Sequence, residues 1–306
     1  MKRSTCVSSI LLLAVCALPA VARDSYQGSF QRSFQVSGPV QLEALTHSGD
    51  ITVRSGPAGT VSISGKIHMG DRWFSGDRQA DVSELEKNPP VRQSGNSIYI
   101  DYPNVRNISI DYDVTVPSDT SVHSHTGSGD QRIEGLRGSL DLESGSGDMR
   151  LTGITGETRL HTGSGDVDVR DLSGAFSAEA GSGDIRLDSK GGGDVQAHTG
   201  SGNIELRGVK GTLRVEAGSG DVSVEGTQTG TWELRTGSGN VDLRLPADAA
   251  FDLEASTSSG KVDTSRPVTM TVQGDLQRAH RSLHGKVNGG GPLLTVHTGS
   301  GDVRID

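Results

Sequence analysis

A four-residue sequence, Gly-Ser-Gly-Asp or Gly-Ser-Gly-Asn, recurs along this chain with a spacing of 18 or 19 residues over most of its second half. Its last two residues are Gly129-Asp130, Gly147-Asp148, Gly165-Asp166, Gly183-Asp184, Gly202-Asn203, Gly220-Asp221, Gly239-Asn240 and, after a longer interval, Gly301-Asp302. A fixed period of this length indicates one structural unit stacked on copies of itself. Repetition also argues against an enzyme, because an active site needs unlike residues gathered at one place.

Each unit contains two short strands and two turns. In the unit 166–183, Val167 and Val169 alternate with polar residues, and Phe176 and Ala178 do so again after a central turn. Glycine supplies the positive φ that tight turns require, and the second-turn glycines align at Gly138, Gly156, Gly174, Gly192, Gly211 and Gly230. The sequence therefore predicts an all-β fold, a right-handed parallel β-solenoid (β-helix) with two strands and about 18 residues per coil.

The chain divides into three parts by sequence. These are a signal peptide at 1–22, an N-terminal β region at 23–125 with a polar insertion at 69–95, and solenoid repeats at 126–306 with a second insertion at 266–292. We expect 23–306 to form one continuous domain, with strands between 34 and 67 forming the first coil. Residues 81–87 predict one or two helical turns. The final strand, 303–305, is expected to leave a free β-edge near the C-terminus.

Residues 1–22 have the features of an export signal. Lys2 and Arg3 precede a short apolar run, and small residues follow it. Both cysteines lie in this segment, so the mature chain has none. Cys16 stands in a sequence similar to a bacterial lipoprotein box, but Val15 occupies a position that normally has Gly, Ala or Ser. We therefore predict an exported protein, periplasmic, cell-surface or secreted, without a transmembrane segment in the mature chain, and with lipidation at Cys16 as the alternative.

The charge balance argues against nucleic acid as a partner. Removing Lys2 and Arg3 from the 29 basic residues leaves 27, against 38 acidic ones, so the mature charge is 27 − 38 = −11. An acidic chain with interspersed signs repels a phosphate backbone. The expected partner is a protein or polysaccharide of a cell surface or envelope, and the sequence leaves the oligomeric state open.

Histidine and glutamate alternate five residues before the turn acids. The column contains His125, Glu143, His161, Glu179, His198 and Glu216. Because neighbouring strands lie about 4.8 Å apart, one hypothesis is a strip that binds zinc or copper. The other is charge pairing that avoids like charges on adjacent strands. A second outward column alternates in sign from Arg170 to Arg244 without histidine, which favours charge pairing.

The turn acids have two explanations as well. Stacked carboxylates are typical of calcium-binding solenoids, whose nonapeptide repeat is G-G-x-G-x-D-x-U-x. Here the acid directly follows the second glycine, the opposite turn carries no acid, and Asn203 and Asn240 replace aspartate in two units. These differences favour side chains that accept hydrogen bonds from turn amides. The sequence thus predicts no cofactor, with calcium and zinc as the alternatives.

The first insertion is the best pocket candidate by sequence. It contains Asp71, Trp73, Phe74, Asp77 and Arg78, and its aromatic pair can either stack on a sugar ring or fasten the loop to the solenoid. No catalytic motif is present, so no catalytic residue is predicted. The function that the sequence favours is a non-enzymatic surface-interaction or structural module. A carbohydrate-binding or carbohydrate-active β-helix and a cation-stabilised solenoid are the alternatives.

Three features of the sequence resemble a known bacterial family. They are the repeated T-G-S-G-D/N units, the segment 114–117 (VTVP), and the segment 283–292 (LHGKVNGGGP) before the last repeat. Together they are similar to the adhesin-like proteins of domain-of-unknown-function family 4097 (DUF4097) over residues 34–306. The resemblance implies an exported β-strand-repeat protein, called an adhesin by inference, without known catalytic residues. The insertion at 69–95 departs from it.

Overall fold

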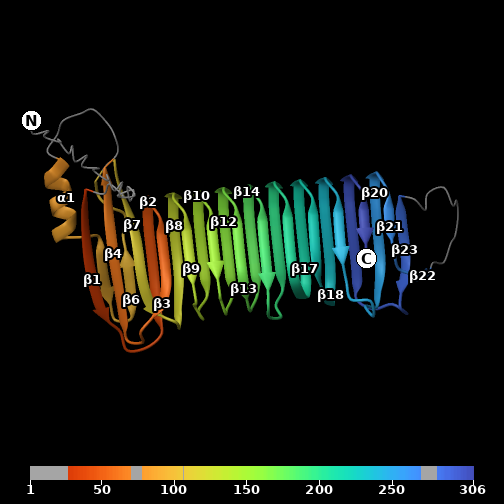
Figure 1. Cartoon of the computed structure of the whole chain (residues 1–306), viewed down its shortest axis with the longest axis horizontal. Coiled ribbons are helices and arrows are strands. Elements are labelled where there is room, and N and C mark those ends of the chain that lie inside the picture. Colours follow the sequence, from red (N-terminus) through yellow and green to blue (C-terminus); the bar gives the residue numbers. More distant parts are fainter. Residues whose placement is uncertain (1–26, 70–77, 106, 270–280) are drawn as a thin grey trace, which may run out of the picture.

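The computed structural model describes residues 27–69, 78–105, 107–269 and 281–306. Its strands lie side by side across the long axis of an elongated stack, with the N-terminal strands at one end (Figure 1). The described residues contain 25 strands joined in one hydrogen-bonded sheet, and a single short helix. That helix is too short and too polar to cross a membrane, and no other helix occurs in the described residues.

The elements follow one another along the chain. The N-terminal region contains β1 (Gly28–Gln35), β2 (Val40–Ser48), β3 (Ile51–Gly56), β4 (Thr60–Met69), α1 (Arg78–Lys87), β5 (Val91–Ser94), β6 (Ser97–Ile100) and β7 (Ile108–Pro117). The repeats contain β8 (Thr120–Ser128), β9 (Gln131–Glu134), β10 (Leu140–Ser146), β11 (Met149–Thr152), β12 (Thr158–Ser164), β13 (Val167–Leu172), β14 (Phe176–Ser182), β15 (Ile185–Ser189), β16 (Val195–Ser201), β17 (Ile204–Ser219), β18 (Val222–Ser238) and β19 (Val241–Arg244). The C-terminal region contains β20 (Phe251–Ser259), β21 (Val262–Thr264), β22 (Val268–Thr269), β23 (Ser282–Val287), β24 (Leu293–Ser300) and β25 (Val303–Ile305).

The repeat strands form two layers of parallel strands. The first layer contains β8, β10, β12, β14 and β16, and the second contains β9, β11, β13 and β15. Leu142 lies opposite Leu160, one sequence period later, and the same offset holds for Leu151 and Val169. The long strands β17 and β18 pair with both layers. The prediction of an all-β, solenoid-like fold is therefore confirmed.

The core lies between the layers and consists of stacked aliphatic side chains. Val167, Ile185 and Ile204 from the second layer are at most 1% exposed, and Leu213 and Val215 from the first are at most 2% exposed. A column of threonines closes this core beside the Gly-Ser-Gly turns. Their hydroxyls donate to glycine carbonyls of an adjacent coil, as Thr199 Oγ1 does to the carbonyl of Gly183 at 3.0 Å. The same alternation that buries aliphatic residues inward thus places the charged columns outward.

The N-terminal end is closed by antiparallel strands and a helix. Of the strands expected to form the first coil, only β2 and β3 do so, pairing in parallel with β8 and β9. β1 and β4 pair antiparallel with each other, and β4 pairs antiparallel with β7. The helical turns predicted at 81–87 are confirmed within α1, which packs Val82 into the core and accepts the amide of Ser29 on Glu86. Antiparallel pairing and α1 keep the edge strand from serving as a template for another chain.

The C-terminal end has an order that differs from the sequence. β24 pairs in parallel with β18 on one side and β20 on the other, and β25 lies between β19 and β21. The expectation of a free β-edge at 303–305 is therefore wrong, because the last strands enter the stack one position early. Figure 1 accordingly shows the C-terminus inside the stack. The last coil at this end of the stack is formed by β20 and β21, and β23 pairs antiparallel with the outer edge of β20.

Candidate binding surface

The His/Glu column lies on the outer face of the first layer, with its members directly opposite one another. Each histidine pairs with the glutamate of the next strand. The Nδ1–Oε2 distances are 3.2 Å for His125–Glu143, 3.6 Å for His161–Glu179 and 3.8 Å for His198–Glu216. All six side chains are more than one third exposed, so each pair contributes about 0.5 kcal/mol or less.

A metal strip would need more ligands at one point than these pairs provide. Zinc in proteins usually takes three or four side-chain ligands. In the part of the chain that the structure describes, no group of three or more His, Cys, Asp and Glu side chains is placed to hold an ion. Zinc binding by the column would therefore require rotations that bring a third ligand to one of the pairs.

The sign-alternating column of the second layer has a different bonding pattern from the one its sequence suggests. Arg170 and Asp188 lie opposite each other across the strands, as predicted. However, Arg170 forms its ion pair with Asp168 on its own strand at 2.7 Å, and Arg207 likewise bonds Glu205. At these two positions the charges are balanced along the strand, whereas Arg54 pairs with Glu134 across neighbouring strands at 3.5 Å.

The turn residues form one continuous hydrogen-bond ladder along the stack. In each step the side-chain Oδ1 accepts the backbone N–H of the equivalent residue in the next coil, at 2.7–3.0 Å. In spatial order the members are Asp111, Asp50, Asp130, Asp148, Asp166, Asp184, Asn203, Asp221, Asn240, Asp302 and Lys261. Asparagine performs this role as well as aspartate, since both offer an Oδ1 acceptor. Lys261 has no such acceptor, and the ladder ends there.

We expect Asp166→Ala to lower the free energy of unfolding by about 1 kcal/mol, because the Asp184 amide loses its acceptor. Asp166→Asn keeps the acceptor and removes one charge from the ladder, so it should match the parent chain within about 0.5 kcal/mol. Urea unfolding, monitored by circular dichroism, measures the stability of both variants. A chelator should leave the melting temperature of each variant unchanged. Equal losses in the two variants, together with a melting temperature that calcium raises, would instead indicate a cation site.

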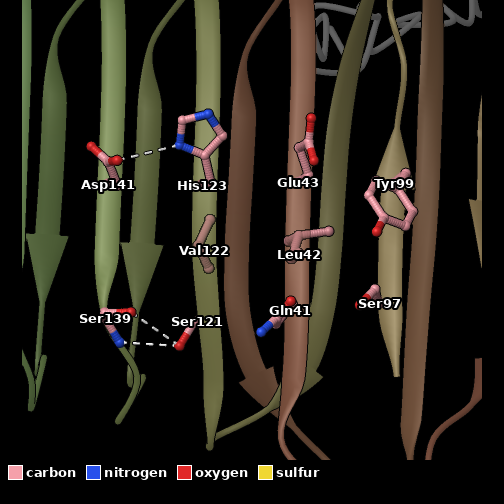
Figure 2. A pocket seen from close by; sticks show the side chains of 10 residues that line it. All are labelled: Gln41, Leu42, Glu43, Ser97, Tyr99, Ser121, Val122, His123, Ser139 and Asp141. Atoms are coloured by element: carbon pink, nitrogen blue, oxygen red, sulfur yellow. Dashed lines mark hydrogen bonds and ion pairs between the residues drawn. The ribbon is translucent and has the colours of Figure 1, made fainter. Parts of the chain in front are cut away.

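A shallow depression of about 280 Å³ lies on the outer face of the first layer, where β6, β2, β8 and β10 adjoin (Figure 2). Its lining residues are Gln41, Leu42, Glu43, Ser97, Tyr99, Ser121, Val122, His123, Ser139 and Asp141. Figure 2 shows two rows: three serines with Gln41 at one end, and Tyr99, Glu43, His123 and Asp141 at the other. The buried Leu42 and Val122 form the floor between the rows.

Tyr99 is held in place from the edge strand beside it. Arg92 of β5 lies opposite Tyr99, and its guanidinium carbon is 3.8 Å from the ring centroid. Asp101 accepts a hydrogen bond from Arg92 at 2.9 Å, and this bond raises the pKa of Arg92. The stacked guanidinium restricts the ring, so Tyr99 presents a fixed aromatic edge.

A second aromatic group lies beyond the lining residues, further along β2 and β8 toward their turns. Tyr102, 38% exposed, stacks on His47 with ring centroids 4.4 Å apart, and its ring meets His125 edge-on at 6.5 Å. This part of the surface therefore combines the first pair of the His/Glu column with exposed aromatic rings. Aromatic and polar groups side by side are typical of ligand-binding surfaces.

A sequence profile of the Toastrack family, DUF4097, matches residues 37–197 and again residues 155–306. The chain belongs to this family. The overlap of the two matches lies within the repeats, as a domain built from one repeated unit allows. The resemblance read from the repeat and its flanking segments is thereby confirmed.

Comparison with individual proteins adds little to the family assignment. A search of curated proteins finds no match. Among solved structures, a "putative cell adhesion protein" from Clostridium sporogenes is 12% identical, with a TM-score of 0.24, covering 90% of this chain and 98% of its own. A "putative adhesin" from Bacteroides fragilis is 14% identical, with a TM-score of 0.37 and coverages of 92% and 98%. Likeness at this level says nothing about function.

The depression of this Toastrack protein is lined, among the described residues, by side chains that sequence reasoning did not single out. Asp71, Trp73, Phe74 and Asp77 lie outside the described residues, and Arg78 is the first residue of α1. The depression was missed because its members come from four strands with unequal spacing in the sequence. One sequence feature could have indicated it: the small outward-facing residues Ser97, Ser121 and Ser139 each lie two residues before a larger outward-facing side chain.

Proposed function

We propose that this Toastrack protein is an exported, non-enzymatic β-solenoid that binds a cell-surface or envelope component through its outer face. The solenoid would have right-handed coils of two strands and about 18 residues, as a single domain over 23–306. The strong preference of parallel crossovers for the right hand supports the handedness. The 18-residue register of paired strands supports the coil size.

The observation that carries the proposal is the repeated outer face of the first layer. It presents the same polar positions coil after coil, with His161 and His198 paired to glutamates and Arg214 paired to both Glu216 and Glu233. Such a surface suits several weak contacts with an extended partner. Linked contacts of this kind give a higher overall affinity than any one of them alone. No cofactor is needed for this role.

The purified chain should bind intact bacterial or host cells, or isolated envelope polysaccharide, in a salt-dependent way. Raising the salt from roughly 50 mM to roughly 500 mM should weaken binding several-fold, because exposed charges are screened. Labelled protein and flow cytometry measure this. Arg214→Glu, on the first layer, should weaken binding at least twofold, whereas the matched Arg207→Glu on the second layer should not.

Two outcomes would contradict the proposal. One is equal binding by the parent chain and Arg214→Glu, with no dependence on salt. The other is turnover of a polysaccharide panel that Asp71→Asn or Asp77→Asn abolishes, which would make the chain a carbohydrate-active enzyme. Protease treatment of intact cells, compared with fractionated ones, separates surface exposure from periplasmic placement.

A further inference from the structure

We propose that the depression between β6, β2, β8 and β10 is a binding site for one neutral sugar ring. The inference rests on the proposed binding function and names a ligand class for it. Three observations carry it: unused hydrogen-bonding groups, an immobilised aromatic ring, and the size and charge of the site.

The first observation is that polar groups converge here without hydrogen-bond partners among the described residues. The side chains of Gln41, Glu43, Ser97 and Tyr99 make no hydrogen bond or ion pair with any described residue. Elsewhere on the same outward row the charges are satisfied: Arg159 bonds Glu157, and Arg214 bonds two glutamates. Water fills these sites in the free protein, and a ligand rich in hydroxyls can replace it.

The remaining lining residues are positioned by contacts among themselves. The Ser139 hydroxyl lies 3.2 Å from that of Ser121, whose oxygen also accepts the Ser139 amide at 3.3 Å. His123 Nδ1 lies 3.5 Å from Asp141 Oδ2. The site therefore has donors and acceptors on both sides of a fixed floor. A ring with hydroxyls around its edge can use both at once, because each hydroxyl donates and accepts.

The second observation is the ring of Tyr99. Arg92 stacks on it, and Figure 2 shows its hydroxyl on the side that faces β2. An aromatic ring with few conformations contributes contact area at low entropic cost, and a sugar offers C–H groups as well as hydroxyls to it. Tyr102 and His47 extend the aromatic surface toward the turns, where a second unit of a chain can lie.

Size and charge define the ligand further. A volume of about 280 Å³ is at the lower end for small-molecule pockets, which suits a single ring. The lining contains the two acids Glu43 and Asp141, and the nearby Arg92 is already paired with Asp101, so acids are in excess and disfavour sugar acids and phosphates. Cations without hydroxyls would leave Gln41 and the serines unused. A neutral pyranose, alone or as a unit of a polysaccharide, has the size of the site, carries no negative charge, and offers hydroxyls to Gln41 and the serines.

In the test, the full chain is titrated with glucose, galactose, mannose, N-acetylglucosamine or glucuronate, and binding is measured by NMR. At least one neutral sugar should bind with a Kd in the millimolar range, typical of so few contacts, and at least tenfold more tightly than glucuronate. Ser121→Trp fills the depression and should reduce the affinity at least tenfold. Glu43→Gln, which retains shape, should reduce it several-fold.

The matched control is Gln196→Trp, an outward position in a central coil that does not line the depression at Tyr99. It should leave the affinity unchanged. Absence of binding by every neutral sugar, or an affinity that both Ser121→Trp and Glu43→Gln leave intact, would overturn the inference. Cell binding that persists in these variants would then show that the broader binding function stands without a sugar site.

Discussion

Replacing Gly183 by alanine should lower the free energy of unfolding by about 3 kcal/mol or more. Gly183 has a φ of +144°, which alanine adopts at a cost of about 1–3 kcal/mol. A Cβ at this position would lie 2.0 Å from the carbonyl oxygen of Gly165 and 2.7 Å from its carbon. Both are backbone atoms of the adjacent coil, so they cannot yield without disturbing the ladder that joins Asp166 to Asp184.

Urea unfolding followed by circular dichroism measures the loss as a change in midpoint. Gly192→Ala is the matched control, because no heavy atom of the described residues lies within 4 Å of a Cβ there and its φ is outside the left-handed region. Its stability should stay within about 1 kcal/mol of the parent chain. Similar losses in the two variants would show that stacked glycine turns do not hold the coils together.

Replacing Trp232 by alanine should cost about 3–5 kcal/mol, the range for large aromatic residues in a core. Trp232 is fully buried and is the largest of the fully buried side chains in the described part of the chain. It lies between Leu213 of β17 and Leu294 of β24, and its Nε1 donates to the carbonyl of Gly211 at 3.0 Å. Its removal therefore opens a cavity where the C-terminal strand joins the stack.

Two variants divide this effect into its parts. Trp232→Phe keeps much of the ring but leaves the Gly211 carbonyl without its partner, so we expect an intermediate loss of about 1–3 kcal/mol. Thr231→Ala, on the exposed side of the same strand, should change stability by less than about 0.5 kcal/mol. The same midpoint for Trp232→Ala and Thr231→Ala would contradict the packing that we describe.

The sequence predicts the parallel stack well because its chemistry repeats. Aliphatic residues such as Val167 and Ile185 can be buried together only when the period places them opposite each other. The second-turn glycines show the limit of such alignment. Gly192 was expected in that column, but Gly193 approaches Gly174, because one extra residue shifts the turn without changing the strands.

Features that depend on order in space, rather than on period, could not be predicted. Every repeat has the same pattern, so the sequence does not show which coil lies next to the coil of Asn240 in space. In the structure Asp302, and not Lys261 of the next repeat in the sequence, occupies that position, between Asn240 and Lys261. The depression at Tyr99 escaped for a related reason. It depends on several side chains that have no hydrogen-bond partner among the described residues, and a missing partner leaves no pattern in a sequence.

The early entry of β24 and β25 into the stack has a consequence for how the chain becomes folded. These strands follow β18 to β23 in the sequence, so they are synthesised after the strands that they join. They nevertheless lie between β18 and β19 on one side and β20 and β21 on the other, although all four of these strands are synthesised before them. The native order of coils can therefore be completed only after β24 and β25 have been made and have entered between their partners. A chain that lacks both β24 and β25 keeps an open strand edge beside Trp232, which a protease or chaperone can recognise.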